Sequence, residues 1–275
     1  MRRLLLVLLL LVAGCAAGPS DERSLILATT TSTQDSGLLD VLLPAFTRDT
    51  GLQVKTLAVG SGQAIELGRR GEADVLLVHS PAAEEKLMAE GTAGRRLLVM
   101  HNDFVIVGPA ADPAGIRGAP GPEALSRIAA ARAVFVSRGD DSGTHAKEKD
   151  LWAKAGVTPG EAWYQATGQG MGATLRVASE KGGYTLSDRA TYLAQRASLG
   201  LEALSEGDAG LLNVYHVIEM TPKAGDRVQP DAAAAFADWI VSPPAQAEIG
   251  RFGTAEFGQP LFTPDAGKDA ASLGR

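Results

Sequence analysis

Three short segments of the chain place hydroxyl groups, glycines and an arginine directly after apolar, strand-like runs. Residues 29–32 follow the run 25–28, residues 60–62 follow 54–59, and residues 138–144 follow 133–136. Where a strand leads into a helix, the first backbone amides lack partners within the helix, and the peptide dipoles leave about half a positive charge there. Such helix ends bind anions. The three segments therefore predict a small oxyanion held between strand ends.

Arg138 is the strongest candidate donor in these segments. A guanidinium group is charged at any relevant pH, and its planar fork can donate two hydrogen bonds to a tetrahedral oxyanion. The alternative is a surface salt bridge to Asp140 or Asp141. The two roles are compatible, because Asp140 can orient Arg138 while Arg138 holds the ligand.

Hydroxyls and backbone amides of the same segments supply the other candidate donors. Ser142 opens a helical pattern over 144–155, although it would also serve as an ordinary N-cap worth about 1 kcal/mol. The hydroxyls at 29–32 predict at least two ligand contacts, and the strand register, which the sequence does not fix, decides which two. The candidate ligand-binding residues are Thr30, Thr31, Ser32, Ser61, Gly62, Arg138, Ser142, Gly143, Thr144 and Gly170.

Two of the weaker signals bear on the nature of the ligand. Gly170 lies in a glycine-rich run, 168–172, that fits a loop before a helix as well as it fits a ligand contact. Asp74 begins the apolar run 74–78. An unprotonated oxyanion needs only donors, whereas hydrogen phosphate also needs an acceptor, so a carboxylate facing the site would favour phosphate. We expect Asp74 to face away from the site or to be paired.

Other chemistries find little support in the sequence. The four histidines are dispersed and lack metal-ligand spacing, so no metal site is predicted. No phosphate-binding loop of the Walker type occurs, so the chain itself does not hydrolyse ATP. Ser142 and His145 are close in sequence, but no Gly-x-Ser-x-Gly elbow surrounds any serine. We therefore predict a protein with no catalytic residues and no cofactor, and keep a hydrolase using Ser142 and His145 as a remote alternative.

Composition and pattern predict an α/β fold that positions these residues. The chain of 275 residues has 45% hydrophobic and only 5% aromatic residues, and its 32 acidic against 26 basic residues argue against nucleic acid as a partner. Strands alternating with helices predict mostly parallel sheets, with ligands at the carboxyl ends of the strands. We expect Pro44 to kink or break its helix and Ser80 to cap the next one. Strand-like runs lie at 25–28, 54–59, 74–78, 97–100, 104–107, 133–136 and 211–218, and helical patterns at 36–47, 81–90, 144–155, 172–181, 188–197, 230–241 and 243–250.

The N-terminus carries the pattern of an export signal. Arg2 and Arg3 precede a short apolar run, 4–12, that is too short to span a membrane. Small residues then lead to Cys15, the only cysteine, as in bacterial lipoprotein signals in which the cysteine is acylated. We predict a signal peptide at 1–14, a lipid-anchored tether at 15–23, and a mature protein outside the cytoplasmic membrane. The alternative is an ordinary signal peptide with an incidental cysteine.

The remaining chain is predicted to form two lobes. A Pro- and Gly-rich segment, 108–122, interrupts the pattern after one extended run, and a second long run follows at 211–218. We expect the chain to cross into a second lobe and return on two strands, which gives lobe I at 24–105 plus 215–275 and lobe II at 106–212. The hydroxyl-rich segments would then face each other across the cleft.

Several segments together closely resemble the tungstate-binding lipoproteins of ABC importers, within the type II periplasmic binding protein family. The resemblance covers nearly all of the mature chain, and Val214 departs from it at a position where the family has proline. The segments that carry it are 28–37, 58–63, 73–79, 102–109, 136–145 and 168–172.

This resemblance implies a monomeric receptor that closes on tungstate and delivers it to a membrane permease driven by a cytoplasmic ATPase. Molybdate, which has nearly the same shape and charge, remains an alternative that no residue excludes. Sulfate and phosphate are smaller and would lose contacts in a cavity set for the larger anion. A sensory module reporting to a membrane kinase is a further alternative, less favoured because a lipid anchor without a spanning helix suits transport better.

Overall fold

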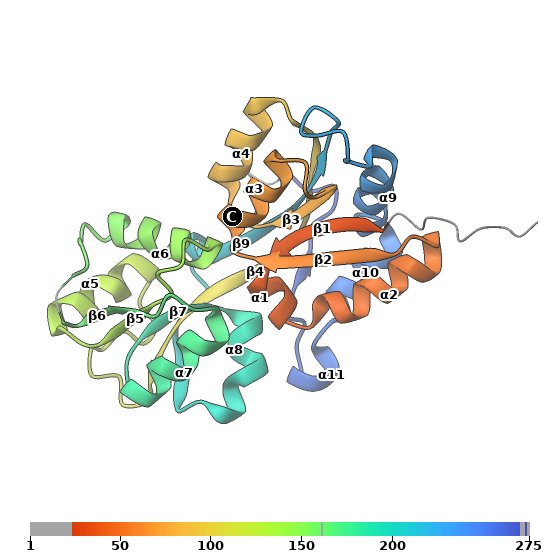
Figure 1. Ribbon diagram of the computed structural model, residues 1–275. Helices are drawn as coiled ribbons and strands as arrows, with labels where there is room; N and C mark the ends of the chain where they lie inside the picture. Colours follow the sequence, from red (N-terminus) through yellow and green to blue (C-terminus); the bar gives the residue numbers. More distant parts are fainter. Residues whose placement is uncertain (1–23, 161, 270–272, 274–275) are drawn as a thin grey trace, which may run out of the picture.

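Strand β4 (Ala93–Pro109) runs through the whole molecule and contributes to both of its lobes (Figure 1). The computed structural model describes residues 24–160, 162–269 and 273. The first part of β4, up to Asp103, pairs antiparallel with β9 (Leu212–Met220), and the part from Phe104 onward pairs antiparallel with β7 and β8. The runs predicted as separate strands at 97–100 and 104–107 are one strand, because the polar residues between them keep partners in β9.

The described residues form ten strands and eleven α-helices. The strands are β1 (Leu25–Thr30), β2 (Val54–Val59), β3 (Val75–Val78), β4 (Ala93–Pro109), β5 (Phe135–Ser137), β6 (Tyr164–Ala166), β7 (Thr185–Asp188), β8 (Leu201–Ser205), β9 (Leu212–Met220) and β10 (Thr263–Pro264). The helices are α1 (Thr31–Asp35), α2 (Leu38–Thr50), α3 (Ser61–Arg69), α4 (Pro81–Glu90), α5 (Gly121–Ala131), α6 (Gly143–Lys154), α7 (Met171–Lys181), α8 (Arg189–Gln195), α9 (Pro230–Ile240), α10 (Pro243–Arg251) and α11 (Thr254–Phe257), with short 3-10 turns η1 (Arg196–Ser198) and η2 (Ala209–Leu211).

The sheet of the first lobe has the strand order β10-β4-β9-β3-β1-β2. Strand β1 runs parallel to both β2 and β3, but β9 lies antiparallel to β3 and β4. In this sheet the expected parallel arrangement holds for β2, β1 and β3, and β9 is antiparallel because the chain returns from the second lobe in the opposite direction. The carboxyl ends of the three parallel strands lie at one edge, beside the second lobe (Figure 1).

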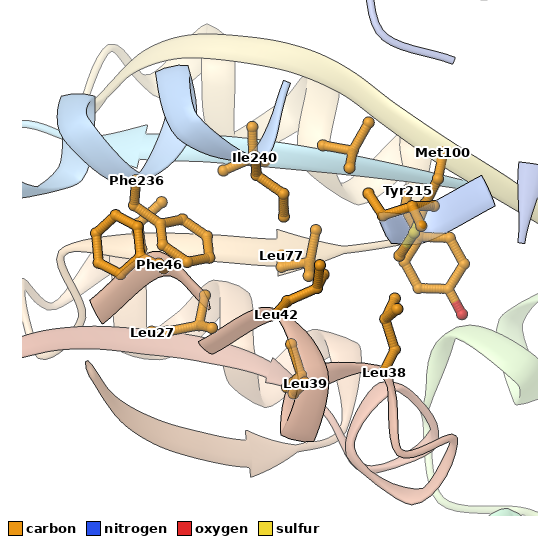
Figure 2. Packing of buried hydrophobic residues seen from close by; sticks show 14 of the residues in the cluster. Leu27, Leu38, Leu39, Leu42, Phe46, Leu77, Met100, Tyr215, Phe236 and Ile240 are labelled. Atoms are coloured by element: carbon orange, nitrogen blue, oxygen red, sulfur yellow. The ribbon is translucent and has the colours of Figure 1, made fainter. Parts of the chain in front are cut away.

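Helices α2 and α9 cover one face of this sheet and enclose its main core. Figure 2 shows Leu42 and Phe46 of α2 packing among Leu77 of β3, Phe236 and Ile240, all of them fully buried. Helix α2 continues through Pro44 as a single element, so the predicted break does not occur. Pro44 is exposed, where water can satisfy the backbone group it leaves free, and burial of the opposite face outweighs the roughly 3 kcal/mol cost of an interior proline.

The second lobe is built from shorter strands around the far half of β4. Strands β5 and β6 pair in parallel, and a bridge from Phe135 to Tyr184 joins them to the segment before β7. Helix α5 begins within the segment 108–122 that the sequence pattern treated as a break. Its apolar face packs with Trp152 and Tyr184 in a separate core, so each lobe has its own hydrophobic centre.

The exact limits of the lobes remain a prediction. We propose that they meet within β4 between Asp103, which pairs with β9, and Phe104, which pairs with β7. This placement lies two residues before the limit predicted at 105, and the division into 24–105 plus 215–275 and 106–212 stays a prediction. Within the described part of the chain, no helix is both long and apolar enough to cross a membrane. The predicted signal peptide, Cys15 and the tether lie outside the described residues.

Candidate anion-binding site

The three parallel strands end side by side, and each is followed by residues with polar side chains. Strand β1 ends at Thr30 and leads into α1, while β2 ends before Gly60, the N-cap of α3, whose first residue is Ser61. Strand β3 ends just before His79. The carboxyl ends of neighbouring parallel strands are the usual place for a ligand in an α/β sheet. The register of this sheet therefore brings the polar groups of all three strands to one edge.

The hydroxyls after β1 form a small buried cluster. Thr30 caps α1, since its Oγ1 accepts a hydrogen bond of 3.2 Å from the backbone N–H of Thr33. The same oxygen lies 3.1 Å from Ser32 Oγ and 3.1 Å from His79 Nε2. Thr29 instead turns into the sheet, where its hydroxyl donates to the Leu77 carbonyl at 2.7 Å. The register of β1 thus directs the Thr29 hydroxyl into the sheet, whereas the Thr30 and Ser32 hydroxyls lie at the carboxyl end of the strand.

Arg138 reaches this edge from the second lobe. Its side chain is only 2% exposed, and Nε and Nη2 donate to Asp140 Oδ2 at 3.1 and 2.5 Å. Nη2 also donates to Thr31 Oγ1 at 3.4 Å. The ion pair with Asp140 exists, but it lies inside the molecule and not at the surface. Among the described residues we find no hydrogen bond from Nη1, which leaves two guanidinium N–H groups available to a ligand.

A buried carboxylate fixes the loop that carries Arg138. Glu148 of α6 accepts hydrogen bonds from Ser137 Oγ at 2.7 Å and from Tyr164 OH at 2.8 Å. Ser137 Oγ in turn accepts from the N–H of Gly139, whose φ of 61° lies in the left-handed region. A Cβ at Gly139 would lie 2.6 Å from Ala166 Cβ, so glycine is needed there. The pKa of Glu148 is raised overall, because burial raises it by more than these hydrogen bonds lower it.

The N-terminus of α6 touches the first lobe directly. Ser142 caps the helix, its Oγ accepting from the N–H of His145 at 3.2 Å, and the N–H of Gly143 donates to Ser61 Oγ at 3.1 Å. A Cβ at Gly143 would lie 2.8 Å from Ser61 Oγ and 2.7 Å from His79 Cε1. Only glycine therefore permits this approach of the two lobes. The Thr144 hydroxyl is buried and has no hydrogen-bond partner among the described residues.

A cavity of about 480 Å³ opens between the lobes at this point. Of the predicted site residues, Thr31, Arg138 and Gly170 line it. Gly170 is the N-cap of α7, so the free amides of a second helix end lie beside the cavity. Ser61 and Gly143 meet each other across the lobes, and Gly62 lies opposite the loop at Asp141. Three of the ten predicted residues therefore line this cavity, and Ser61, Gly62 and Gly143 lie at contacts between the lobes.

Asp74 lies at the other end of its strand, away from this region. It directly precedes β3, and its carboxylate accepts hydrogen bonds from the backbone N–H groups of Ile26 and Gln229, both at 2.7 Å. The expectation that Asp74 is paired is confirmed. The carboxylate beside the cavity is Asp140, whose two oxygens accept from Arg138 and from the N–H of Ser142.

His79 is the residue that the sequence analysis missed. Its ring is 5% exposed and packs against Tyr215 at 4.7 Å between centroids, and Nε2 also lies 3.4 Å from Ser32 Oγ. Burial, with a smaller contribution from Arg138, lowers the pKa of His79 to about 4, although Glu84 opposes the shift. His79 is therefore neutral at pH 7. Its position directly after an apolar strand could have indicated a site residue. The sequence analysis considered the histidines only as metal ligands and therefore did not single it out.

The buried, neutral His79 predicts a loss of stability in acid. Because its pKa falls from 6.5 to about 4 on folding, the folded state binds fewer protons, so stability is complete above pH 6.5 and declines as the pH falls towards 4. We expect the free energy of unfolding to fall by on the order of 3 kcal/mol more in the wild type than in His79→Gln over this range. Urea unfolding of both proteins at pH 7, 5.5 and 4.5 measures the difference. Equal losses would show that His79 does not titrate as described.

Comparisons with known proteins agree with the fold and with the oxyanion chemistry. A family model described as a PBP (periplasmic binding protein) superfamily domain matches residues 16–244. The tungstate-binding protein TupA of Peptoclostridium acidaminophilum is 50% identical over 248 residues, which cover 89% of this chain and 87% of that protein.

Solved structures give the same result. The tungstate-binding protein TupA from Desulfovibrio alaskensis G20 matches with a TM-score of 0.76 and 49% identity, over 88% of this chain and 99% of that one. A structure described as the tungstate ABC transporter from Geobacter sulfurreducens matches with a TM-score of 0.77 and 46% identity, over 84% and 99% of the two chains.

Proposed function

The chain belongs to the periplasmic binding protein superfamily and to the family of the tungstate-binding proteins TupA, and we propose that it captures tungstate between its lobes for an ABC importer. The fold is the two-lobed type II fold of that superfamily. Tungstate is here a cargo that is bound and released, and no covalent step is needed. Molybdate remains the nearest alternative ligand.

The observation that carries this proposal is the buried Arg138 at the interlobe cavity. Its Nη1 has no hydrogen-bond partner among the described residues and can donate two hydrogen bonds, while Asp140 orients the rest of the guanidinium. Hydrogen bonds to charged groups contribute about 1.5–3 kcal/mol each, so a few of them suffice for tight binding after closure and ordering costs are deducted. The net charge of −6 makes this local positive field essential for attracting an anion.

We propose that further donors complete the site from both lobes. Thr144 supports this most directly, because a buried hydroxyl without a partner is costly unless a ligand or water satisfies it. The N-terminal amides of α7 and the dipole of α6 add partial positive charge. The proposed ligand-binding residues are Thr30, Thr31, Ser32, Ser61, Gly62, Arg138, Ser142, Gly143, Thr144 and Gly170.

The hydrolase alternative needs a hydrogen-bonded pair of nucleophile and base. The His145 ring instead accepts a hydrogen bond of 3.0 Å at Nδ1 from the backbone N–H of Asp141. Ser142 Oγ accepts from the His145 backbone, and no bond from this hydroxyl to the ring is found among the described residues. This geometry supports a binding role for Ser142 rather than a nucleophilic one.

Calorimetric titration of the protein beginning at residue 20 tests the proposal. We expect one tungstate per chain to bind tightly, with sulfate and phosphate far weaker. Equal or tighter binding of molybdate would support the oxyanion site but would indicate molybdate as its ligand. No binding of any of these four anions would contradict the oxyanion-binding function.

We propose that Cys15 anchors the mature protein to the outer surface of the cytoplasmic membrane or to another extracytoplasmic membrane surface. A lipid anchor would keep the receptor near its permease, to which a monomer would deliver the anion. In cells that process lipoproteins, the wild type is expected in the membrane fraction and Cys15→Ala in the soluble fraction. Membrane fractionation with antibody detection measures this, and a wild type that is soluble after processing would refute the anchor.

A further inference from the structure

His79 is in contact with both lobes at the place where they meet. On its own side, Nε2 lies 3.1 Å from Thr30 Oγ1 and 3.4 Å from Ser32 Oγ. On the other side lies Gly143 of α6, where a Cβ would be 2.7 Å from His79 Cε1 and 2.8 Å from Nδ1. One imidazole therefore contacts two of the hydroxyls at the site and supports the helix that closes over them.

The first lobe holds this ring firmly in place. Its face packs on Tyr215, which is 1% exposed. The next residue, Ser80, donates its backbone N–H to Glu84 Oε1 at 2.7 Å. Glu84 is fully buried and is paired with Arg96 at 2.8 Å and with His216 at 2.9 Å. Ser80 is the N-cap residue of α4, as expected, although its side chain makes no capping hydrogen bond. The Glu84 carboxylate instead fixes the turn through the Ser80 backbone N–H.

A rigid ring at this position has two consequences for the site. Because Nε2 lies close to two hydroxyls, it restricts how they rotate and therefore where they can direct a hydrogen bond. Because the ring edge lies against Gly143, it sets how deeply α6 can approach. Both effects depend on the same side chain, so the alignment of the hydroxyls and the docking of α6 are linked.

We propose that His79 is a positioning residue of the anion site, which aligns Thr30 and Ser32 through Nε2 and provides the surface on which Gly143 docks when the lobes close. This inference rests on the proposed function and adds a residue that acts through its neighbours. A ring that served only as core packing would require shape and burial, but not a polar atom at Nε2.

Three substitutions separate these roles. The amide of His79→Gln can reach the place of Nε2, the amide of His79→Asn reaches only that of Nδ1, and His79→Phe keeps the ring without either nitrogen. We expect His79→Gln to bind tungstate within about threefold of the wild type, and the Asn and Phe variants at least tenfold more weakly. Thermal unfolding of all variants at pH 7.5 shows whether each remains folded at the titration temperature.

Calorimetry with tungstate, molybdate, sulfate and phosphate on the wild type and the three variants gives the result. Rescue by Gln, but not by an equally stable Asn variant, would support the inference. Wild-type affinity in all three variants, or equal weakening of Gln and Asn, would overturn it while leaving the proposed function intact. A wild type that bound none of the four anions would overturn both.

Discussion

Arg138→Ala is expected to lower the affinity for tungstate by at least about a hundredfold. The substitution would remove the two charge-assisted hydrogen bonds that we propose Arg138 makes to the anion, each of which contributes roughly 1.5–3 kcal/mol. It also leaves the Asp140 carboxylate beside the cavity without its cation, so that the dianion would meet a negative charge. Isothermal titration of the variant and the wild type, at the same pH and salt, measures the effect.

Controls for this prediction distinguish charge from geometry. Arg138→Lys keeps the charge but loses the planar fork, so its affinity should lie between those of the wild type and Arg138→Ala. Arg95→Ala removes an arginine from an exposed pair with Glu219 and should bind like the wild type. If a folded Arg138→Ala variant bound tungstate with wild-type affinity, Arg138 would not be a ligand-binding residue. The proposed function would then lose its main support.

Gly143→Ala is expected to weaken tungstate binding at least tenfold while leaving the free protein folded. The added methyl group would lie 2.7–2.8 Å from His79 and Ser61, closer than real Cβ contacts, so α6 could no longer dock on the first lobe. Alanine also favours a helix more than glycine does, by up to about 1 kcal/mol. The open protein should therefore be no less stable than the wild type, although it binds the anion less well.

Gly160→Ala is the matched control, because a Cβ at that position meets no atom within 4 Å. It should bind tungstate like the wild type. Small-angle X-ray scattering with and without tungstate shows whether closure is lost, since the wild type should contract on binding and Gly143→Ala should not. Full contraction of Gly143→Ala with unchanged affinity would mean that the approach of α6 seen here is not the bound arrangement.

The sequence was sufficient to predict that the candidate site segments directly follow strands. Arg138 and Ser142 could be placed at a helix start because an apolar run, glycine and hydroxyls occur there in order. The choice between Thr29 and Thr31 could not be made, since it depends on strand register. In the structure, Thr29 bonds within the sheet and Thr31 reaches Arg138. Residues 60–62 (Gly-Ser-Gly) lie at the start of helix α3. The sequence analysis did not predict this helix, because Gly68 and several polar residues interrupt its apolar pattern.

Most of the features that could not be predicted from the sequence depend on the topology of the fold. The strands at β7 and β8 are short and partly polar, and they are stabilised as strands by pairing with β4. The antiparallel course of β9 follows from the return of the chain, which no local pattern encodes. The position of His79 after an apolar run could be read from the sequence, but its contacts with Thr30 and Ser32 could not, because these residues are 49 and 47 positions away.

Anomalous diffraction at a tungsten absorption edge, from crystals of the complex, shows whether tungstate is held between the lobes at Arg138. We expect one strong anomalous peak per chain, placed so that the oxygens of the tungstate reach Arg138 Nη1, in the cavity that Thr31 and Gly170 also line. A peak elsewhere in the molecule, or no ordered tungsten in crystals grown with saturating tungstate, would contradict it.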